Sequence, residues 1–282
     1  MITGIRKWYR RTWEARKWQR DEFQAQMHHF LHHDAVTTQI FAHRGSKCNR
    51  PENTLSAFTE AIRVGSDGIE LDVHLTRDQQ LIVIHDESLE RTTNGAGLVR
   101  ELNFEQIRHY SAGAWFDAKY THEKVPLLSE VLALLVKLKF KGVLNIEIKT
   151  DKFQYPNIEK ITSSLLLSQH FPFSHVYSSF NLKSLKLLSK LEPHADLCLL
   201  MSTSEPKIQQ GLNTKYITHL HPRLDWLQKN TDKLKHLGKP LRPWTLNNDA
   251  DIHLAFDYHL SGFMTDYPEQ AVHIKSLYNQ KK

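Results

Sequence analysis

Short apolar runs alternate with longer amphipathic segments along most of this 282-residue chain. The short runs are typical of buried strands, whereas the longer segments have the apolar spacing of helices. The predicted strands cover residues 39–42, 68–72, 81–84, 143–146, 175–178, 196–201, 216–220, 241–245 and 262–265. Alternation of this kind predicts a parallel sheet with helical crossovers, and about eight such units close naturally into a (β/α)8 barrel.

Nine predicted strands are one too many for such a barrel. The link between residues 72 and 81 is too short for a parallel crossover, which needs a dozen or more residues. We therefore expect a hairpin that turns near residues 77–79, and this pair of strands contains the extra one. The irregular residues 88–124 then form an insertion, in which Arg91 either contacts phosphate or stabilises the loop. The predicted fold class is α/β, a (β/α)8 TIM barrel with a small insertion after the third strand and an N-terminal helix.

Residues 1–38 precede the predicted barrel of residues 39–282. Residues 1–20 contain seven Lys or Arg and one acid, which equals the whole net charge of +6. The rest of the chain is neutral overall, which argues against nucleic acid as its partner. Apolar residues recur with helical spacing across residues 4–33 and predict a basic amphipathic helix. This helix either packs on the barrel or on a second copy, or lies on an anionic membrane surface.

Apolar runs and cysteine content indicate where in the cell the protein is located. No apolar run reaches the about 18 residues of a membrane span, and the N-terminus lacks the apolar core of a signal peptide. The only two cysteines, Cys48 and Cys198, fit a reducing compartment better than a disulfide framework. We therefore expect a cytoplasmic protein, with peripheral contact at the inner face of the membrane through residues 4–33 as an open alternative. The sequence does not indicate the oligomeric state.

Charged side chains gather where the first predicted strands end. His43 and Arg44 follow the first strand, and His85 follows the hairpin, roughly opposite Glu70. Glu70 and Asp72 point to the same side, about 7 Å apart along their strand. Two such carboxylates raise each other's pKa unless a cation lies between them, and hard divalent cations prefer oxygen ligands. The pair therefore predicts two metal ligands, with His85 as a proton-transfer group beside them.

Seven polar or aromatic residues fall at or near predicted strand ends, which is where barrels of this kind carry their active sites. They are His43, Glu70, Asp72, Glu147, Lys149, Ser179 and Trp244. Lys149 lies two residues after Glu147 and would face the same cavity, where it would neutralise a phosphate oxygen. His219 and His221 also alternate near a strand end and stay unassigned. The helical pairs formed by His28, His29, His32 and His33 are interpreted as a solvated helix end.

These motifs closely resemble the glycerophosphodiester phosphodiesterase family of bacterial type, from about residue 39 to the C-terminus. The matching pieces are His43-Arg44-Gly45, Pro51-Glu52-Asn53-Thr54, Glu70-Leu71-Asp72, His85-Asp86, Arg91-Thr92-Thr93 between Leu89 and Gly95, Val125-Pro126-Leu127, Glu147-Ile148-Lys149, Ser179-Phe180, Trp244-Thr245 and Thr265-Asp266-Tyr267-Pro268. So many motifs in the family's order form a far more specific signal than any one of them.

The resemblance implies metal-dependent hydrolysis of small-molecule glycerophosphodiesters to glycerol 3-phosphate and an alcohol. It implies Glu147 as the third ligand of a divalent cation, Mg²⁺ or Ca²⁺, and His43 and His85 as the acid–base pair. Arg44 and Lys149 would bind the phosphate, and Trp244 would pack against the glycerol-like group. Two alternatives stay open: a lysophospholipase D that acts at a membrane surface, and a non-catalytic sensor of phosphate ligands.

Overall fold

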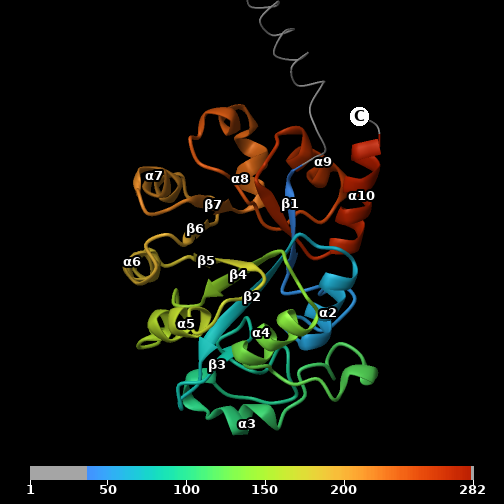
Figure 1. Ribbon diagram of the computed structural model, residues 1–282, viewed down its shortest axis with the longest axis vertical. Helices are drawn as coiled ribbons and strands as arrows, with labels where there is room; N and C mark the ends of the chain where they lie inside the picture. The colour runs from blue at the N-terminus through green and yellow to red at the C-terminus, as the bar shows by residue number, and fades with distance from the viewer. Residues whose placement is uncertain (1–36, 281–282) are drawn as a thin grey trace, which may run out of the picture. The chain divides into compact units, whose positions relative to one another are not determined.

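Seven parallel strands form the central sheet of the computed structural model, which describes residues 37–280 (Figure 1). Their order is β7-β6-β5-β4-β2-β1-β8. The strands are β1 (Gln39–His43), β2 (Gly68–Leu75), β4 (Val143–Ile148), β5 (Ser174–Ser179), β6 (Asp196–Met201), β7 (His219–Pro222) and β8 (Gly262–Thr265). The predicted helix at residues 4–33 and its histidine pairs lie outside the described residues.

An eighth segment, residues 241–246, closes this sheet. It forms two isolated parallel bridges on the β7 side. On the β8 side, the Met264 amide donates to the Pro243 carbonyl at 2.9 Å, and the Leu246 amide donates to the Met264 carbonyl at 2.9 Å. The segment therefore joins the two edge strands, and the predicted (β/α)8 barrel is confirmed. Only its hydrogen bonding is less regular than that of the other seven strands.

The extra predicted strand is β3 (Leu81–Val83), which lies off the main path of the sheet and pairs antiparallel with β2. On its other side, Ile82 forms an isolated bridge with Leu127. The Thr76 amide donates to the Gln80 carbonyl at 3.0 Å, so the chain turns where the sequence predicted a hairpin. Val73 pairs with Val83, and the Ile84 amide donates to the Asp72 carbonyl at 3.1 Å. This register places His85 within one residue of its predicted position opposite Glu70.

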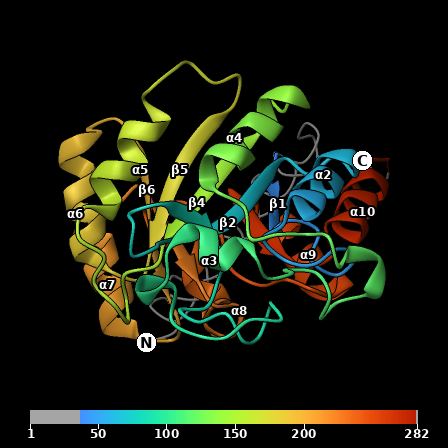
Figure 2. The same cartoon turned by 90° about the horizontal axis from the view of Figure 1, so that it is seen from below.

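Helices cover the outer side of the sheet. They are α2 (Leu55–Arg63), α4 (Leu128–Lys137), α5 (Ile158–Leu166), α6 (Leu182–Leu191), α7 (Glu205–Asn213), α8 (Leu224–Lys229) and α9 (Asp249–Asp257), followed by α10 (Pro268–Gln280). Figure 2 shows α5, α6 and α7 outside β4, β5 and β6. The side chain of Thr54 caps α2 by accepting from the Ala57 amide at 3.3 Å, as expected for a threonine before a first turn. None of the helices within residues 37–280 is long and apolar enough to cross a membrane.

The insertion after β3 has a small apolar core of its own. It contains α3 (Phe104–Arg108) and two 3₁₀ turns, Val99–Glu101 and Ala118–Tyr120. Its core consists of Ile82, Ile84, Leu89, Val99, Ile107, Ala112 and Val125. Arg108 anchors it to α4 through a two-pronged ion pair with Glu130, at 2.6 and 2.7 Å. The segment is thus an ordered part of the fold, held beside the C-terminal end of β2.

Candidate active site

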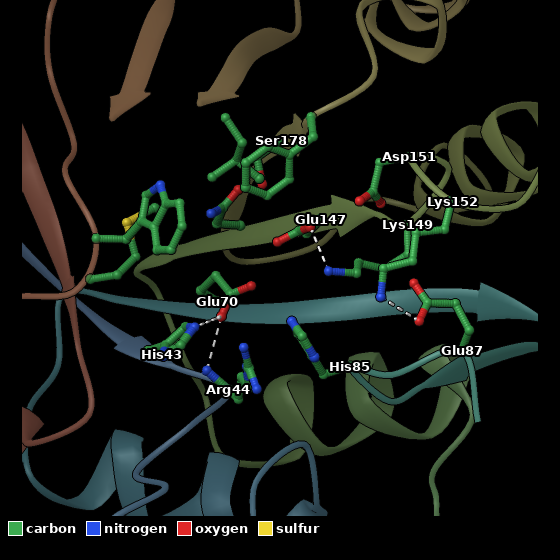
Figure 3. A pocket seen from close by; sticks show the side chains of 15 residues that line it. His43, Arg44, Glu70, His85, Glu87, Glu147, Lys149, Asp151, Lys152 and Ser178 are labelled. Atoms are coloured by element: carbon green, nitrogen blue, oxygen red, sulfur yellow. Dashed lines mark hydrogen bonds and ion pairs between the residues drawn. The ribbon is translucent and has the colours of Figure 1, made fainter. Parts of the chain in front are cut away.

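The charged residues of the separate motifs meet around one cavity of about 370 Å³ at the C-terminal ends of the strands (Figure 3). Of the predicted site residues, those that line it are His43, Arg44, Glu70, His85, Glu147, Lys149 and Trp244. Asp72 is only 1% exposed and is not part of the lining, but one of its oxygens lies within 4.8 Å of oxygens of Glu70 and of Glu147, its partner on the next strand. The structure therefore brings all eight predicted residues into one site.

Three buried carboxylates form the centre of the site. One oxygen each from Glu70, Asp72 and Glu147 lies within 4.8 Å of the others. Burial and the neighbouring carboxylates raise the pKa of Glu70 well above its usual range. Burial also raises the pKa of Glu147 to about 7, although Lys149 opposes this shift. Burial acts in the same direction on Asp72, but Lys149, His85 and Arg44 outweigh it and lower the pKa of that carboxyl.

This donor set fits a hard divalent cation. It consists of oxygen atoms only, and such cations coordinate oxygen ligands. Asp72 Oδ1 is buried and has no hydrogen-bond partner among the described residues, as expected of an atom whose partner is a ligand. Like charges this close raise the free energy of the ionised state until a cation lies between them. Glu70, Asp72 and Glu147 are thus suited to hold one metal ion.

Arg44 and Lys149 supply positive charge beside the carboxylates. The Arg44 amide donates to Glu70 Oε2 at 2.9 Å, and its guanidinium donates to Glu52 Oε1 at 2.9 Å. The Arg44 Nε atom lies 3.5 Å from Asp72 Oδ2 and, within residues 37–280, has no hydrogen-bond partner. Lys149 Nζ donates to Glu147 at 2.8 Å and lies 3.6 Å from Asp72. These two cations face the position that a bound anion would take.

A glycine makes the sharp turn after His43 possible. Gly45 has a φ of +78°, and a Cβ at this position would lie 2.7 Å from the backbone carbon of Ala57 in α2. A side chain would therefore force the loop away from the helix. The close approach keeps His43 and Arg44 directed into the cavity.

The His43 ring is fixed by a carboxylate from the other end of the chain. Its Nδ1 atom lies 2.6 Å from Asp266 Oδ1, and its Nε2 atom lies 4.0 Å from Glu70 Oε2. Asp266 also accepts a hydrogen bond from Asn247 at 2.9 Å and pairs with Lys47 at 3.2 Å. Burial, assisted by Arg44, lowers the pKa of His43 to about 4 in spite of Asp266. The ring is therefore neutral at neutral pH and can accept a proton at Nε2.

The His85 ring is also held by a carboxylate, in the same way as His43. Its Nδ1 atom lies 2.6 Å from Asp86 Oδ1, and Figure 3 shows the ring pointing toward the buried carboxylates. Burial lowers the pKa of His85, whereas Asp72 and Asp86 oppose this shift. Both predicted acid–base residues thus have one ring nitrogen held by a carboxylate, which fixes the orientation of the ring.

An apolar wall completes the cavity. Phe180 packs edge-on against Trp244 with the ring centroids 5.8 Å apart, and Leu200 and Met264 lie in the same lining. The Trp244 indole N–H donates to the His221 carbonyl at 2.9 Å, which holds the ring in place. This wall is suited to the carbon atoms of a small ligand, and the packing of Trp244 against a glycerol-like group stays a prediction.

Strand alternation corrects the prediction for Ser179. Its hydroxyl donates to the Ile148 carbonyl at 2.8 Å, while Ser178 faces the cavity. Asn145 lines the cavity as well, and the amide of Asn145 and the hydroxyl of Ser178 make no hydrogen bond within the described part of the chain. Sequence reasoning missed both, although their two-residue spacing from Glu147 and Phe180 is a usable signal. His221 is fully buried and is absent from the cavity lining.

Cys48 lies in the loop after β1, as expected for an ordinary loop cysteine. Burial and the acids Glu269 and Asp266 raise its pKa, so nothing activates the thiol. The structure therefore gives no support to Cys48 as a nucleophile.

Comparison with known proteins shows to which family the chain belongs. A profile of the glycerophosphoryl diester phosphodiesterase family matches residues 43–270. The chain belongs to this family. A glycerophosphodiester phosphodiesterase from Bacillus altitudinis is 37% identical over 243 residues, covering 84% of this chain and 98% of that protein. One from Caldanaerobacter subterraneus is 36% identical over 240 residues, covering 85% and 98%.

Solved structures agree with this assignment. A phosphodiesterase from Oleispira antarctica, in complex with the product sn-glycerol 3-phosphate, is similar with a TM-score of 0.75 and 27% identity. The match covers 84% of this chain and 96% of that one. A glycerophosphodiester phosphodiesterase from Agrobacterium tumefaciens has a TM-score of 0.68 at 25% identity, covering 84% and 99%. The predicted resemblance, barrel fold and enzyme class are therefore confirmed.

Proposed function

We propose that the protein hydrolyses glycerophosphodiesters to glycerol 3-phosphate and an alcohol with the help of a divalent cation and two histidines. Family membership supports the reaction, and the product bound to the Oleispira antarctica relative supports the substrate class. The observation that carries the proposal is the convergence of three carboxylates, two carboxylate-held imidazoles, an arginine and a lysine on one cavity.

Glu70, Asp72 and Glu147 would hold the cation, Mg²⁺ or Ca²⁺. When bound, it supplies positive charge to a phosphate oxygen and lowers the pKa of a coordinated hydroxyl. Arg44 binds another phosphate oxygen through its guanidinium, whose Nε atom makes no hydrogen bond within residues 37–280 although it lies 3.5 Å from Asp72. Lys149 adds positive charge where the transition state gains negative charge.

His43 accepts the proton of the nucleophile at Nε2, since Asp266 occupies its Nδ1 atom. The nucleophile is the glycerol 2-hydroxyl or a water molecule. His85 donates a proton to the departing alkoxide, because the negative charge of a bound phosphodiester raises the pKa of this imidazole. If the 2-hydroxyl attacks, a cyclic phosphate forms first, and water then opens it with the two roles reversed. Trp244 and Phe180 pack against the glycerol carbons.

A comparison of two substrates tests the proposal. The protein should release glycerol 3-phosphate from glycerophosphocholine, and a chelator should stop this release. Release of choline from lysophosphatidylcholine instead would favour the lysophospholipase D alternative. Binding of glycerol 3-phosphate without turnover of either substrate would favour the sensor.

Replacing Asp266 with asparagine should lower kcat by roughly 10- to 100-fold, the loss that is typical when the outer partner of a metal-binding residue is removed and that we expect here for His43. The amide keeps the shape of the side chain but no longer stabilises the imidazolium that forms during the reaction. Steady-state kinetics with glycerophosphocholine measure this effect. Lys47→Met is the control, because it removes another partner of Asp266 (3.2 Å) without touching the ring. An unchanged kcat in Asp266→Asn contradicts the role given to Asp266.

A further inference from the structure

Arg91 lies between two carboxylates and pairs with both. Its Nη1 and Nη2 atoms donate to Glu52 at 3.0 and 2.8 Å, and its Nε and Nη2 atoms donate to Asp86 at 2.6 and 3.1 Å. Two-pronged pairs of this kind fix geometry as well as charge. All four donations go to protein carboxylates, and Arg91 is absent from the cavity lining, so the structure lends no support to a direct phosphate contact by this residue.

The two carboxylates hold residues of the proposed reaction on their other sides. Glu52 accepts a hydrogen bond from the Arg44 guanidinium at 2.9 Å, and Asp86 lies 2.6 Å from His85 Nδ1. An unbroken chain of ion pairs therefore runs from Arg44 through Glu52, Arg91 and Asp86 to His85. Its members come from the loop after β1, the loop after β3 and the insertion.

We propose that Arg91 is a positioning residue that couples the phosphate-binding Arg44 to the acid–base residue His85, through Glu52 and Asp86. The inference rests on the proposed function, because that function gives Arg44 and His85 their roles. It extends the residues that support the reaction into the insertion, which otherwise has no part in the proposed mechanism.

The surroundings of the two carboxylates show why their orientation depends on Arg91. The Glu52 side chain is 7% exposed and is held by Arg44 and Arg91 from two directions. The Asp86 side chain is 27% exposed, so without Arg91 it is free to turn toward water. Loss of Arg91 therefore releases the His85 ring and leaves Glu52 to draw the Arg44 guanidinium away from the phosphate position.

The exposed fractions of these side chains also distinguish a positioning role of Arg91 from a purely structural one. The Arg91 side chain is 45% exposed, which limits its contribution to the free energy of unfolding. The buried Glu52 keeps the Arg44 guanidinium as a partner when Arg91 is lost, so its charge stays paired. Arg91 substitutions should therefore change the kinetics much more than the melting temperature. A structural anchor would show the opposite pattern.

Arg108 provides a matched control in the same insertion. It forms a two-pronged ion pair with Glu130, its side chain is 34% exposed, and it contacts neither Arg44 nor His85. We expect Arg91→Met to lower kcat/KM for glycerophosphocholine roughly 10- to 100-fold, and Arg108→Met to leave it within about twofold. Arg91→Lys should recover only part of the loss, since an ammonium cannot span both carboxylates. Equal losses of kcat/KM in Arg91→Met and Arg108→Met overturn the proposal.

Two further measurements separate the failure of this inference from failure of the proposed function. In the His85→Ala background, Arg91→Met should lower the residual kcat by a smaller factor than it does in the unmodified protein, because the effects of interacting residues are not additive. The second readout is the ¹⁵N NMR signal of the His85 ring, assigned from His85→Ala, which needs no substrate. We expect Arg91→Met to shift this signal and Arg108→Met to leave it in place. An unshifted signal overturns the coupling, whatever the protein hydrolyses.

Discussion

Replacing either His43 or His85 with alanine should remove nearly all turnover of glycerophosphocholine and leave the fold intact. A general acid or base typically contributes roughly 10² to 10⁴ in rate. Both rings have one nitrogen held at 2.6 Å by a carboxylate and direct the other edge at the cavity. Neither ring belongs to the apolar packing of the barrel, so a cooperative melting transition should remain. Stopped assays of glycerol 3-phosphate release, with thermal melts of the same samples, measure both expectations.

His175 offers a control for these two variants. Its Nε2 atom lies 3.0 Å from a Glu192 oxygen, so it is also a carboxylate-held imidazole. It belongs to the start of β5, whereas the cavity residue Ser178 lies near the end of that strand. His175→Ala should therefore keep full activity. Near-normal turnover in His43→Ala or His85→Ala rules out the acid–base assignment for that residue.

The barrel and most of the site were predictable because both follow from local patterns. Strand alternation alone places Glu70 with Asp72 and Glu147 with Lys149 on one face. The link between residues 72 and 81 is too short for a parallel crossover, so the chain forms the hairpin that places His85 near the carboxylates. The segment that closes the barrel was predicted as a strand over residues 241–245, where the alternation of strands and helices requires one, although its hydrogen bonds are few.

Other features depend on contacts that no local pattern encodes. Asp266 and His43 are 223 residues apart in the chain, and their pairing follows only from closure of the barrel. Both partners of Arg91 precede it in the sequence, Asp86 by 5 residues and Glu52 by 39, and no local pattern predicts the longer pairing. Phosphate contact and loop stabilisation could therefore not be separated. Ser178 and Ser179 are adjacent serines, and only the strand register decides which of them faces the cavity. Sequence patterns thus identify the reacting groups better than the residues that orient them.

Removing divalent cations should abolish turnover, and adding Mg²⁺ or Ca²⁺ to the metal-free protein should raise its melting temperature. A ligand at 100 times its Kd stabilises the folded state by about 2.7 kcal/mol, which corresponds to a shift of roughly 5–10 °C for a domain of this size. The shift needs no assay of activity. Differential scanning fluorimetry across a metal titration measures it directly.

The shift should grow as the pH rises. Burial raises the pKa of Glu147 to about 7 and also raises that of Glu70. In the metal-free protein, a raised carboxyl pKa stabilises the fold at low pH, and this contribution is lost as the pH rises through about 7. A cation binds the ionised carboxylates and competes with protons for them. We therefore expect a larger metal-induced shift at pH 8 than at pH 5.5.

Substitutions identify the carboxylates responsible. Glu70→Gln should mainly weaken metal affinity, so that excess metal partly restores turnover and the thermal shift needs a higher metal concentration. Asp151→Asn is the matched control, because Asp151 lines the same cavity without belonging to the carboxylate cluster. If Glu70→Gln and the unmodified protein titrate alike, or if the shift is the same at both pH values, the cation is held elsewhere. If the metal titration and the pH dependence both change as expected, the cation is assigned to the buried carboxylates. Among the residues that line the cavity, Glu70 and Glu147 combine a raised pKa with a place beside Arg44 and Lys149.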